Sequence, residues 1–305
     1  MAPEMAPGDN AAKPGRLPTA AALAALILIW STTWAVIRVG LRGIPPFTGV
    51  ALRFALASAA LLALAPFFGV KLGRNRTERH LWVANALLTF AIPYGVLYWA
   101  EQEVPSGLAS VLFATFPLMV AVVAHLTLAG ERLTPRGIVG ILVGFAGIAV
   151  IFSEDFHHLG GPRVGIAAAV LLIAPFSAAF GSIVIKKWGS GVHPMSTAAV
   201  PMGMAALLMG ALALAVERGR PVHFNTPSVL AVLYLAIVGS AIPFTIYFWL
   251  LKHQTATGMS LINYATPVLA VLIGTLFLSE PFTVRVLLGT ALVLVGVGIA
   301  LRKKH

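Results

Sequence analysis

Aromatic and polar residues recur at helical spacing inside the most apolar parts of this sequence. One row contains Trp30 and Trp34, and another contains Tyr94, Tyr98 and Gln102, with neighbours in each row four residues apart. Residues at this spacing share one face of a helix, so each row would form a wall. Such walls hold flat apolar groups and attract ammonium groups to the ring faces. The chemistry on offer is binding, although the same residue types also form aromatic belts at membrane surfaces.

The second half of the sequence adds further candidates for ligand contact. Phe244, Tyr247 and Phe248 form another aromatic group, and Asn263 and His125 are polar residues inside apolar runs. Burying an unpaired amide costs about 1–3 kcal/mol, so these polar groups must meet water, cargo or another helix. His125 also changes protonation near neutral pH. Interhelical hydrogen bonding is the alternative for both polar residues, and core packing is the alternative for the phenylalanines.

An internal repeat links the two halves of the chain. The segment Ala91–Trp99 reads AIPYGVLYW, and Ala241–Trp249 reads AIPFTIYFW. The offset of 150 residues, or 149 further on, continues through matched serine, proline, glutamate, threonine, arginine and glycine positions. This pattern indicates a duplicated unit of about 150 residues, as many transporters contain.

Matched prolines lie inside the repeated runs. Pro93 and Pro243 are 150 residues apart, as are Pro117 and Pro267. A proline within a helix removes the hydrogen bond to the carbonyl four residues earlier and bends the helix. We expect these four prolines to act as hinges for gating. The alternative is that membrane helices simply tolerate proline because the freed carbonyl is satisfied locally.

Composition indicates that lipid is the solvent for most of the chain. Of 305 residues, 59% are hydrophobic and 10% are charged, whereas soluble domains carry about 25% charged residues. The chain has no cysteine, which excludes disulfides and thiolate metal sites. The net charge of +11 comes from short basic tracts between apolar runs. These tracts fit membrane orientation better than nucleic-acid binding.

Ten apolar runs divide the sequence. They are 18–38, 46–69, 81–101, 105–129, 136–152, 163–185, 195–216, 228–251, 256–279 and 282–301. A helix needs about 20 residues to cross a hydrocarbon layer of about 30 Å, so the runs predict ten transmembrane helices. With the N-terminus inside, cytoplasmic segments hold 14 of the 21 lysines and arginines. The bias predicts that both termini are cytoplasmic.

Five spans in each repeat is an odd number, so the second copy must enter the membrane upside down. The predicted fold is therefore all-α, with ten transmembrane helices arranged as two inverted five-helix repeats around a central cavity. We expect a disordered cytoplasmic tail over 1–17, the first repeat over 18–152 and the inverted second repeat over 163–301.

Glycines are concentrated in the fifth and tenth runs. Gly140, Gly144 and Gly147 lie three or four residues apart, and Gly289 and Gly296 occupy matching positions in the second copy. Small residues at this spacing let two membrane helices approach closely. We expect these two helices to pack through their glycine faces.

The acidic ends of the fourth and ninth spans, Gly130-Glu131 and Ser279-Glu280-Pro281, complete a familiar arrangement. Together with the five-plus-five duplication and the glycine-rich fifth and tenth spans, they make the sequence resemble the drug/metabolite transporter superfamily. Its closest branch is the EamA-type exporters, among which the sequence is most similar to exporters of aromatic amino acids. The resemblance implies alternating access and a cavity lined by spans 1–4 and 6–9. Spans 5 and 10 would lie to one side, against each other or a second subunit.

The leading functional hypothesis is a secondary transporter in the cytoplasmic (inner) membrane, exporting or equilibrating amino acids or similar metabolites. The exporter of drugs, the channel and the membrane enzyme remain as alternatives, although no H-E-x-x-H, G-x-S-x-G or Walker-type motif is present. We expect no cofactor, no metal and no nucleic acid, and a monomer or homodimer in lipid. No carboxylate lies in mid-span, so coupling would use His125 or an end carboxylate, or be absent. Arg53 either snorkels outward or holds a carboxylate.

Overall fold

The structure is a computed structural model that describes residues 15–73, 75–128, 134–154, 161–256, 259, 262–281 and 283–301, and every regular element in these ranges is helical. The first half contains α1 (Arg16–Gly40), α2 (Pro46–Leu64), η1 (Ala65–Phe68), α3 (Arg76–Asn85), η2 (Ala86–Ala91), α4 (Ile92–Ala100), α5 (Ser106–Phe113), α6 (Phe116–Thr127) and α7 (Pro135–Phe152). The second half contains α8 (Pro162–Leu171), α9 (Ile173–Trp188), α10 (Pro194–Val216), α11 (Thr226–Ala236), η4 (Ile237–Ala241), α12 (Ile242–His253), α14 (Ile262–Leu278) and α15 (Val284–Leu301).

Consecutive elements join into the spans that the apolar runs predict. Eight stretches are long and apolar enough to cross a membrane, and the shorter apolar helices Thr266–Leu278 and Val284–Ile299 bring the described total to ten. The third span joins α3, η2 and α4, and the eighth joins α11, η4 and α12. Prolines lie in the first turn of most of these stretches, where a backbone N–H would have no acceptor within the helix.

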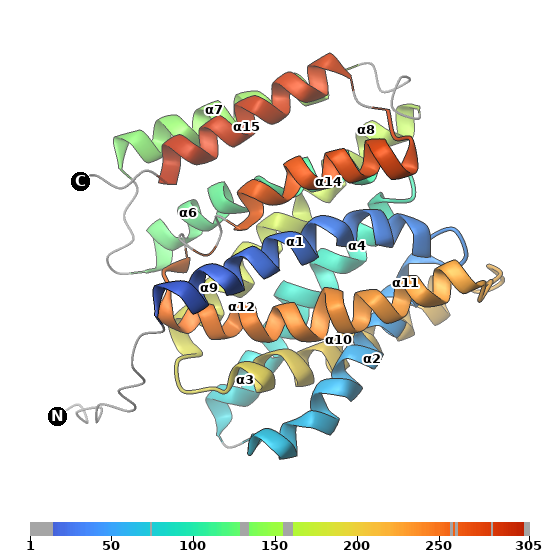
Figure 1. Cartoon of the computed structure of the whole chain (residues 1–305), viewed down its shortest axis with the longest axis vertical. Coiled ribbons are helices and arrows are strands. Elements are labelled where there is room, and N and C mark those ends of the chain that lie inside the picture. The colour runs from blue at the N-terminus through green and yellow to red at the C-terminus, as the bar shows by residue number, and fades with distance from the viewer. Residues whose placement is uncertain are drawn as a thin grey trace.

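The two halves run in opposite directions. We call the end where α1 starts and α15 finishes the terminal end, and the end with the turn between α1 and α2 the far end (Figure 1). α1 runs from the terminal end to the far end, whereas α8 and α9 run from the far end back. The all-helical fold with two inverted five-helix repeats is therefore confirmed.

Helices α7 and α15 lie side by side at one edge of the bundle (Figure 1). A methyl group at Gly147 would lie 2.6 Å from the Gly289 carbonyl oxygen, and one at Gly289 would lie 2.7 Å from the Gly147 carbonyl oxygen. A methyl group at Gly296 would lie 2.5 Å from the Gly140 carbonyl oxygen. The two backbones therefore touch directly, because glycine leaves no side chain between them. The pair packs on span 4 through a small core that includes Leu118 of α6 and Val293 of α15.

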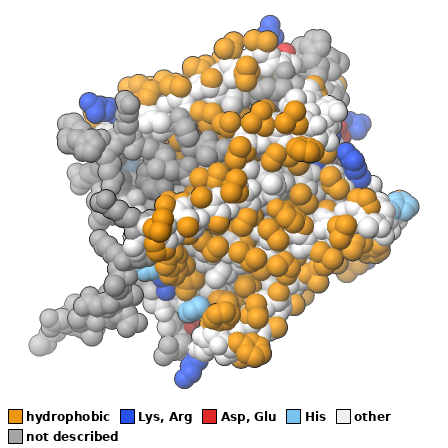
Figure 2. Space-filling view, in the orientation of Figure 1, with side chains coloured by type: hydrophobic (Ala, Val, Ile, Leu, Met, Phe, Trp, Pro, Cys, Tyr) orange, Lys and Arg blue, Asp and Glu red, His pale blue; other side chains and the backbone are white. Residues whose placement is uncertain are grey.

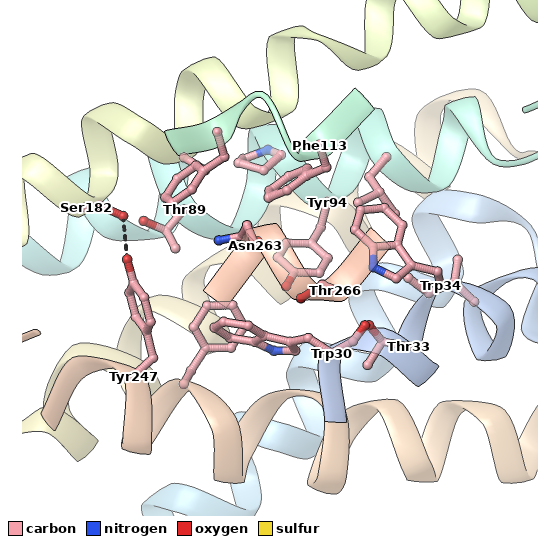
Figure 3. Close-up of a pocket in the computed structure, with 16 residues that line it drawn as sticks. Trp30, Thr33, Trp34, Thr89, Tyr94, Phe113, Ser182, Tyr247, Asn263 and Thr266 are labelled. Atoms are coloured by element: carbon pink, nitrogen blue, oxygen red, sulfur yellow. Dashed lines mark hydrogen bonds between the residues drawn. The ribbon is translucent and has the colours of Figure 1, made fainter. Parts of the chain in front are cut away.

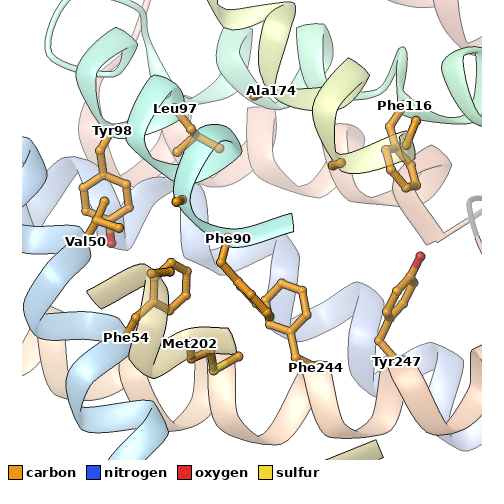
Figure 4. Packing of buried hydrophobic residues seen from close by; sticks show 14 of the residues in the cluster. Val50, Phe54, Phe90, Leu97, Tyr98, Phe116, Ala174, Met202, Phe244 and Tyr247 are labelled. Atoms are coloured by element: carbon orange, nitrogen blue, oxygen red, sulfur yellow. The ribbon is translucent and has the colours of Figure 1, made fainter. Parts of the chain in front are cut away.

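The remaining spans surround the main core. Phe54, Phe90, Phe244 and Phe248 pack edge to face or tilted at its centre, with centroids 4.8 to 6.4 Å apart (Figure 4). Hydrophobic side chains cover the middle of the face seen in Figure 2, while lysines and arginines lie toward its edges. An apolar middle with charged edges is the surface that a lipid bilayer requires.

The matched prolines Pro93 and Pro243 each follow a widened helical turn. The N–H of Ile92 donates to the Leu87 carbonyl, and the N–H of Ile242 donates to the Ile237 carbonyl, five residues earlier in both cases. These π-turns, η2 and η4, lie directly before Pro93 and Pro243, which cannot donate to the carbonyl four residues earlier. The two halves thus contain the same irregularity at the same place in spans 3 and 8.

Candidate functional site

A cavity of about 80 Å³ lies between the two halves, with side chains from spans 1, 3, 4, 6, 8 and 9 around it (Figure 3). Its lining residues are Trp30, Thr33, Trp34, Ile37, Thr89, Pro93, Tyr94, Leu97, Phe113, Phe116, Ala178, Ser182, Phe244, Tyr247, Asn263 and Thr266. Spans 2 and 7 contribute none of them, so the expectation that these spans line the cavity is wrong here: α2 and α10 pack against each other behind the wall.

Aromatic rings form most of the cavity wall. The Trp30 ring contacts Phe244 and Tyr247 at centroid distances of 5.5 and 5.6 Å, and Trp34 meets Phe113 edge-on at 5.6 Å. Spans 1 and 8 come from different halves, so the Trp30 contacts cross the seam between the repeats. Phe54 and Phe244 support the Tyr94 ring at 5.0 and 6.2 Å. The cavity is therefore built to contact a flat apolar group.

Several polar groups in this wall have no protein partner. Among the described residues, the indole N–H groups of Trp30 and Trp34 and the Thr89 hydroxyl are buried and make no hydrogen bond. Leaving a buried donor unsatisfied costs about 1–3 kcal/mol. In contrast, the hydroxyls of Ser182 and Tyr247 bond each other across 3.0 Å. The two indole donors are thus available to a hydrogen-bond acceptor on a bound molecule.

Arg53 lies behind Tyr94 and places a buried guanidinium next to the cavity wall. Its guanidinium is 1% exposed and stands 4.6 Å from the Tyr94 ring centroid. It donates to the Ser240 hydroxyl at 2.7 Å and to the Gly239 carbonyl at 3.0 Å. Gly239 is the residue whose carbonyl Pro243 leaves without its usual helical donor. Arg53 therefore does not snorkel outward, and it joins the first half to the π-turn of the second.

Four of the predicted contact residues lie outside the cavity. Tyr98 is buried, and its hydroxyl accepts a hydrogen bond from Arg53 at 3.4 Å. Phe248 is buried behind Phe244. Gln102 is exposed at the far end, and His125 is exposed near the end of α6 at the terminal end. The other predicted residues, Trp30, Trp34, Tyr94, Phe244, Tyr247 and Asn263, come together around the cavity with Pro93.

The remaining predicted hinges differ from one another. Pro117 lies in the first turn of α6, directly after the break at residues 114–115, whereas Pro267 lies inside α14. The acidic ends of the fourth and ninth spans cannot be compared, because Glu131 lies outside the described residues.

The far end holds carboxylates that join the halves. Glu280 accepts hydrogen bonds from the backbone N–H groups of Ser106 and Gly107 at 2.8 and 3.0 Å. Glu217 accepts from the N–H groups of Phe47 and Thr48 at 2.8 and 2.9 Å. Each carboxylate of the second half thus caps a helix N-terminus of the first, which is a favourable place for negative charge. These contacts join the two halves at the far end.

Sequence reasoning missed several lining residues that helical spacing could have found. Trp30, Thr33, Trp34 and Ile37 follow the i, i+3, i+4, i+7 pattern of one helix face, so the face of the tryptophans already included Thr33 and Ile37. Phe113 had no such spacing signal, although the break after α5 lies where Pro117 removes the helical hydrogen bond to the Phe113 carbonyl.

An odd-numbered helical repeat, inverted and duplicated around a cavity at the seam, is the architecture of many secondary membrane transporters. The comparisons give the family: the chain matches the EamA-like transporter family over residues 18–153 and 165–302 and belongs to it. It is thus a membrane transporter and not an enzyme.

Relatives and a solved structure agree with this assignment. The uncharacterized inner membrane transporter YedA of Escherichia coli K12 is 35% identical over 260 residues, which are 85% of this chain and 82% of YedA. The uncharacterized transporter YvbV of Bacillus subtilis 168 is 24% identical over 92% of this chain and 90% of its own. A crystal structure that is 22% identical matches the fold with a TM-score of 0.70, covering 94% of this chain and 98% of its own. These relatives support the family, and not specifically the aromatic amino-acid exporter YddG.

Proposed function

We propose that this transporter moves amino acids, including aromatic or apolar ones, or similar small metabolites across the cytoplasmic membrane by alternating access. The observation that carries the proposal is the aromatic cavity at the seam of the repeats, with two unpartnered indole N–H donors. The rings suit a flat apolar side chain, and the donors suit a carboxylate. None of the described lining residues is acidic or basic, so an ammonium group would rest against ring faces.

The direction and membrane orientation belong to the same proposal. The excess of lysine and arginine in the loops of the terminal end favours a cytoplasmic terminal end and places the far end outside. The inner-membrane relative YedA supports the location. We propose that the hydrogen bonds of Glu280 and Glu217 hold the far end shut, so that the described state is closed to the outside. We propose export or facilitated diffusion by a monomer or homodimer.

Counterflow in proteoliposomes tests this function. Vesicles loaded with an unlabelled aromatic amino acid should take up a labelled one in a saturable transient, because a carrier exchanges cargo faster than it returns empty. Vesicles without protein are the control. Absence of counterflow with amino acids of every side-chain class would contradict the proposed cargo, and conduction that does not saturate would indicate a channel.

A further inference from the structure

A buried carboxyl group at the far end has no role in the contacts described so far. Glu101 caps the C-terminus of α4 and is 0% exposed. Neither of its carboxylate oxygens has a hydrogen-bond partner among the described residues. The end of a helix carries partial negative charge, which disfavours a carboxylate. Burial without a partner disfavours the charged form further.

The second repeat shows that the local fold does not need this carboxyl. In the first half, Arg38 donates to the backbone carbonyl of Glu101. In the second half, Lys186 donates to the carbonyl of Leu251 at 2.9 Å and to that of Gln254 at 2.6 Å. Leu251 lies 150 residues after Glu101 and is equally buried, at 1% exposure. In both copies, a basic side chain from span 1 or span 6 thus donates to the carbonyls at the end of the matching helix. Leu251 occupies the position of Glu101 in the second copy, so this arrangement does not require a carboxyl group there.

Glu101 also lies between the cavity and a wide polar vestibule. It follows Leu97, a cavity residue, by one helical turn toward the far end. It borders a vestibule of about 720 Å³, which Gln102, Glu103, Pro105 and Glu280 also line. Opening the far end would therefore expose this carboxyl to water.

The charged groups around Glu101 come from several elements. Burial raises the pKa of Glu101 well above its ordinary value of 4.5, Arg38 opposes this rise, Glu280 adds to it and Arg53 lowers it. Arg42 and Glu103 line the same vestibule, and Arg220 donates to neighbouring Gln102 at 3.3 Å. Among the helices packed on α4, α8 carries the exposed Arg163, and the lysines of α9 lie at the terminal end.

We propose that the Glu101 carboxyl is a proton-binding site at the outer gate, occupied while the far end is closed and emptied when it opens. This proposal rests on the proposed function only in that the far end opens to the outside. It does not depend on which molecule is transported. Because the proton is held more tightly in the closed state, acid favours closure. The bias toward closure is complete below the ordinary pKa of glutamate. It is lost as the pH rises through the higher pKa of the closed state.

Cysteine labelling measures this opening directly, because the chain has no native cysteine. Ile37 lines the cavity and is 2% exposed, so Ile37→Cys reacts with an impermeant maleimide added outside cells only when the far end opens. After division by the reactivity of a small free thiol at each pH, the labelling rate should rise about tenfold per pH unit within the titration window. Addition of Glu101→Gln should abolish the rise, since glutamine mimics the protonated carboxyl.

Two further variants make the outcome decisive. Glu103→Gln makes the same chemical change two residues away in the same vestibule and should leave the rise intact. Glu101→Asp keeps a titratable group and should restore a rise that Glu101→Gln removes, even if its midpoint moves. A rise that persists in Glu101→Gln, or a corrected rate independent of pH in the parent, would overturn the proposal. Size-exclusion profiles of the purified variants separate misfolding from a gate that stays shut.

Discussion

Individual side chains of the cavity wall offer two kinds of contact to a bound molecule, ring packing and hydrogen bonding. The Trp30 ring contacts Phe244 and Tyr247 across the seam in tilted pairs, while its N–H has no partner among the described residues. Tyr94 is held between Phe54 and Phe244 with a guanidinium at its back. The Trp30 ring therefore packs against the other wall residues, and its unpartnered N–H can orient a bound molecule by donating a hydrogen bond to it. Substitutions that remove one property and keep the other should separate these roles.

Tyr94→Ala should weaken cargo binding without preventing insertion. Removal of the ring leaves a gap in the wall, and an aromatic pair contributes about 0.5–1.5 kcal/mol, so the half-saturation concentration should rise about three- to tenfold. Counterflow of a labelled aromatic amino acid measures the change. Phe180→Ala is the matched control, because Phe180 is exposed on α9 and lies outside the cavity. Wild-type counterflow in a well-folded Tyr94→Ala protein would remove Tyr94 from the cargo site.

Trp30→Phe should affect binding more than stability. The substitution keeps an aromatic ring but removes an N–H that no described residue uses. A hydrogen bond to a charged acceptor contributes about 1.5–3 kcal/mol, so the half-saturation concentration for a carboxylate cargo should rise at least about tenfold. The Tm of the purified protein should hardly change. A large loss of Tm together with unchanged affinity would show that the N–H serves the fold.

Among the secondary-structure elements, the paired π-turns are the features most suited to movement. The other half of the molecule contacts each one: Ser177 donates to the Leu88 carbonyl at 3.0 Å in η2, and Arg53 donates to the Gly239 carbonyl at 3.0 Å in η4. A π-turn followed by proline has fewer regular backbone bonds to lose when the helix bends. Motion of the repeats is therefore expected to concentrate at η2 and η4.

Pro243→Ala should slow transport while leaving the protein folded. Alanine restores an N–H, so the turn can relax toward a regular helix that bends less easily. The Tm should stay the same or rise, and the counterflow rate should fall. Pro194→Ala is the control, because Pro194 stands in the first turn of α10, where proline fits without a bend. An unchanged rate in Pro243→Ala would show that η4 is not a hinge.

Gly147→Ala should destabilise the α7–α15 pair. The new methyl group would lie 2.6 Å from the Gly289 carbonyl oxygen, so the two backbones must separate. Overpacking of this kind costs about 1–3 kcal/mol, which thermal unfolding of the detergent-solubilised protein would detect as a lower Tm. Gly191→Ala, where the added methyl group meets no atom within 4 Å, should leave the Tm unchanged. Equal Tm values for the two variants would contradict the packing argument.

The whole molecule is organised by its inversion. Because each repeat has five spans, equivalent residues of the two copies lie at opposite ends of the path through the protein. Arg38 closes a helix end at the far end, and Lys186 closes the matching one at the terminal end. Two similar ends joined at one cavity can open alternately by related motions. The inversion thus supplies the geometric basis for alternating access.

The proposed orientation can be tested with single cysteines introduced into this cysteine-free chain. Val222→Cys lies at the far end and should react with an impermeant maleimide added outside intact cells. Arg79→Cys, in the first turn of the third span at the terminal end, should react only after the membrane is permeabilised. The opposite pattern would reverse the assignment of outside and inside without changing the fold.

The sequence by itself determined the solvent, the number of spans and their inversion, because these follow from local quantities: the length of apolar runs, the placement of charge and the parity of a repeated unit. Helical spacing also predicted that Trp30 and Trp34 share one cavity face, whereas of the row Tyr94, Tyr98 and Gln102 only Tyr94 lines the cavity. Only the tertiary structure decided which candidates meet. It directed Tyr98 toward Arg53 instead of the cavity, left His125 on the surface and brought Phe113 to Trp34. It also enclosed the Glu101 carboxyl without a partner. These outcomes depend on packing between spans far apart in the chain, which no local pattern records.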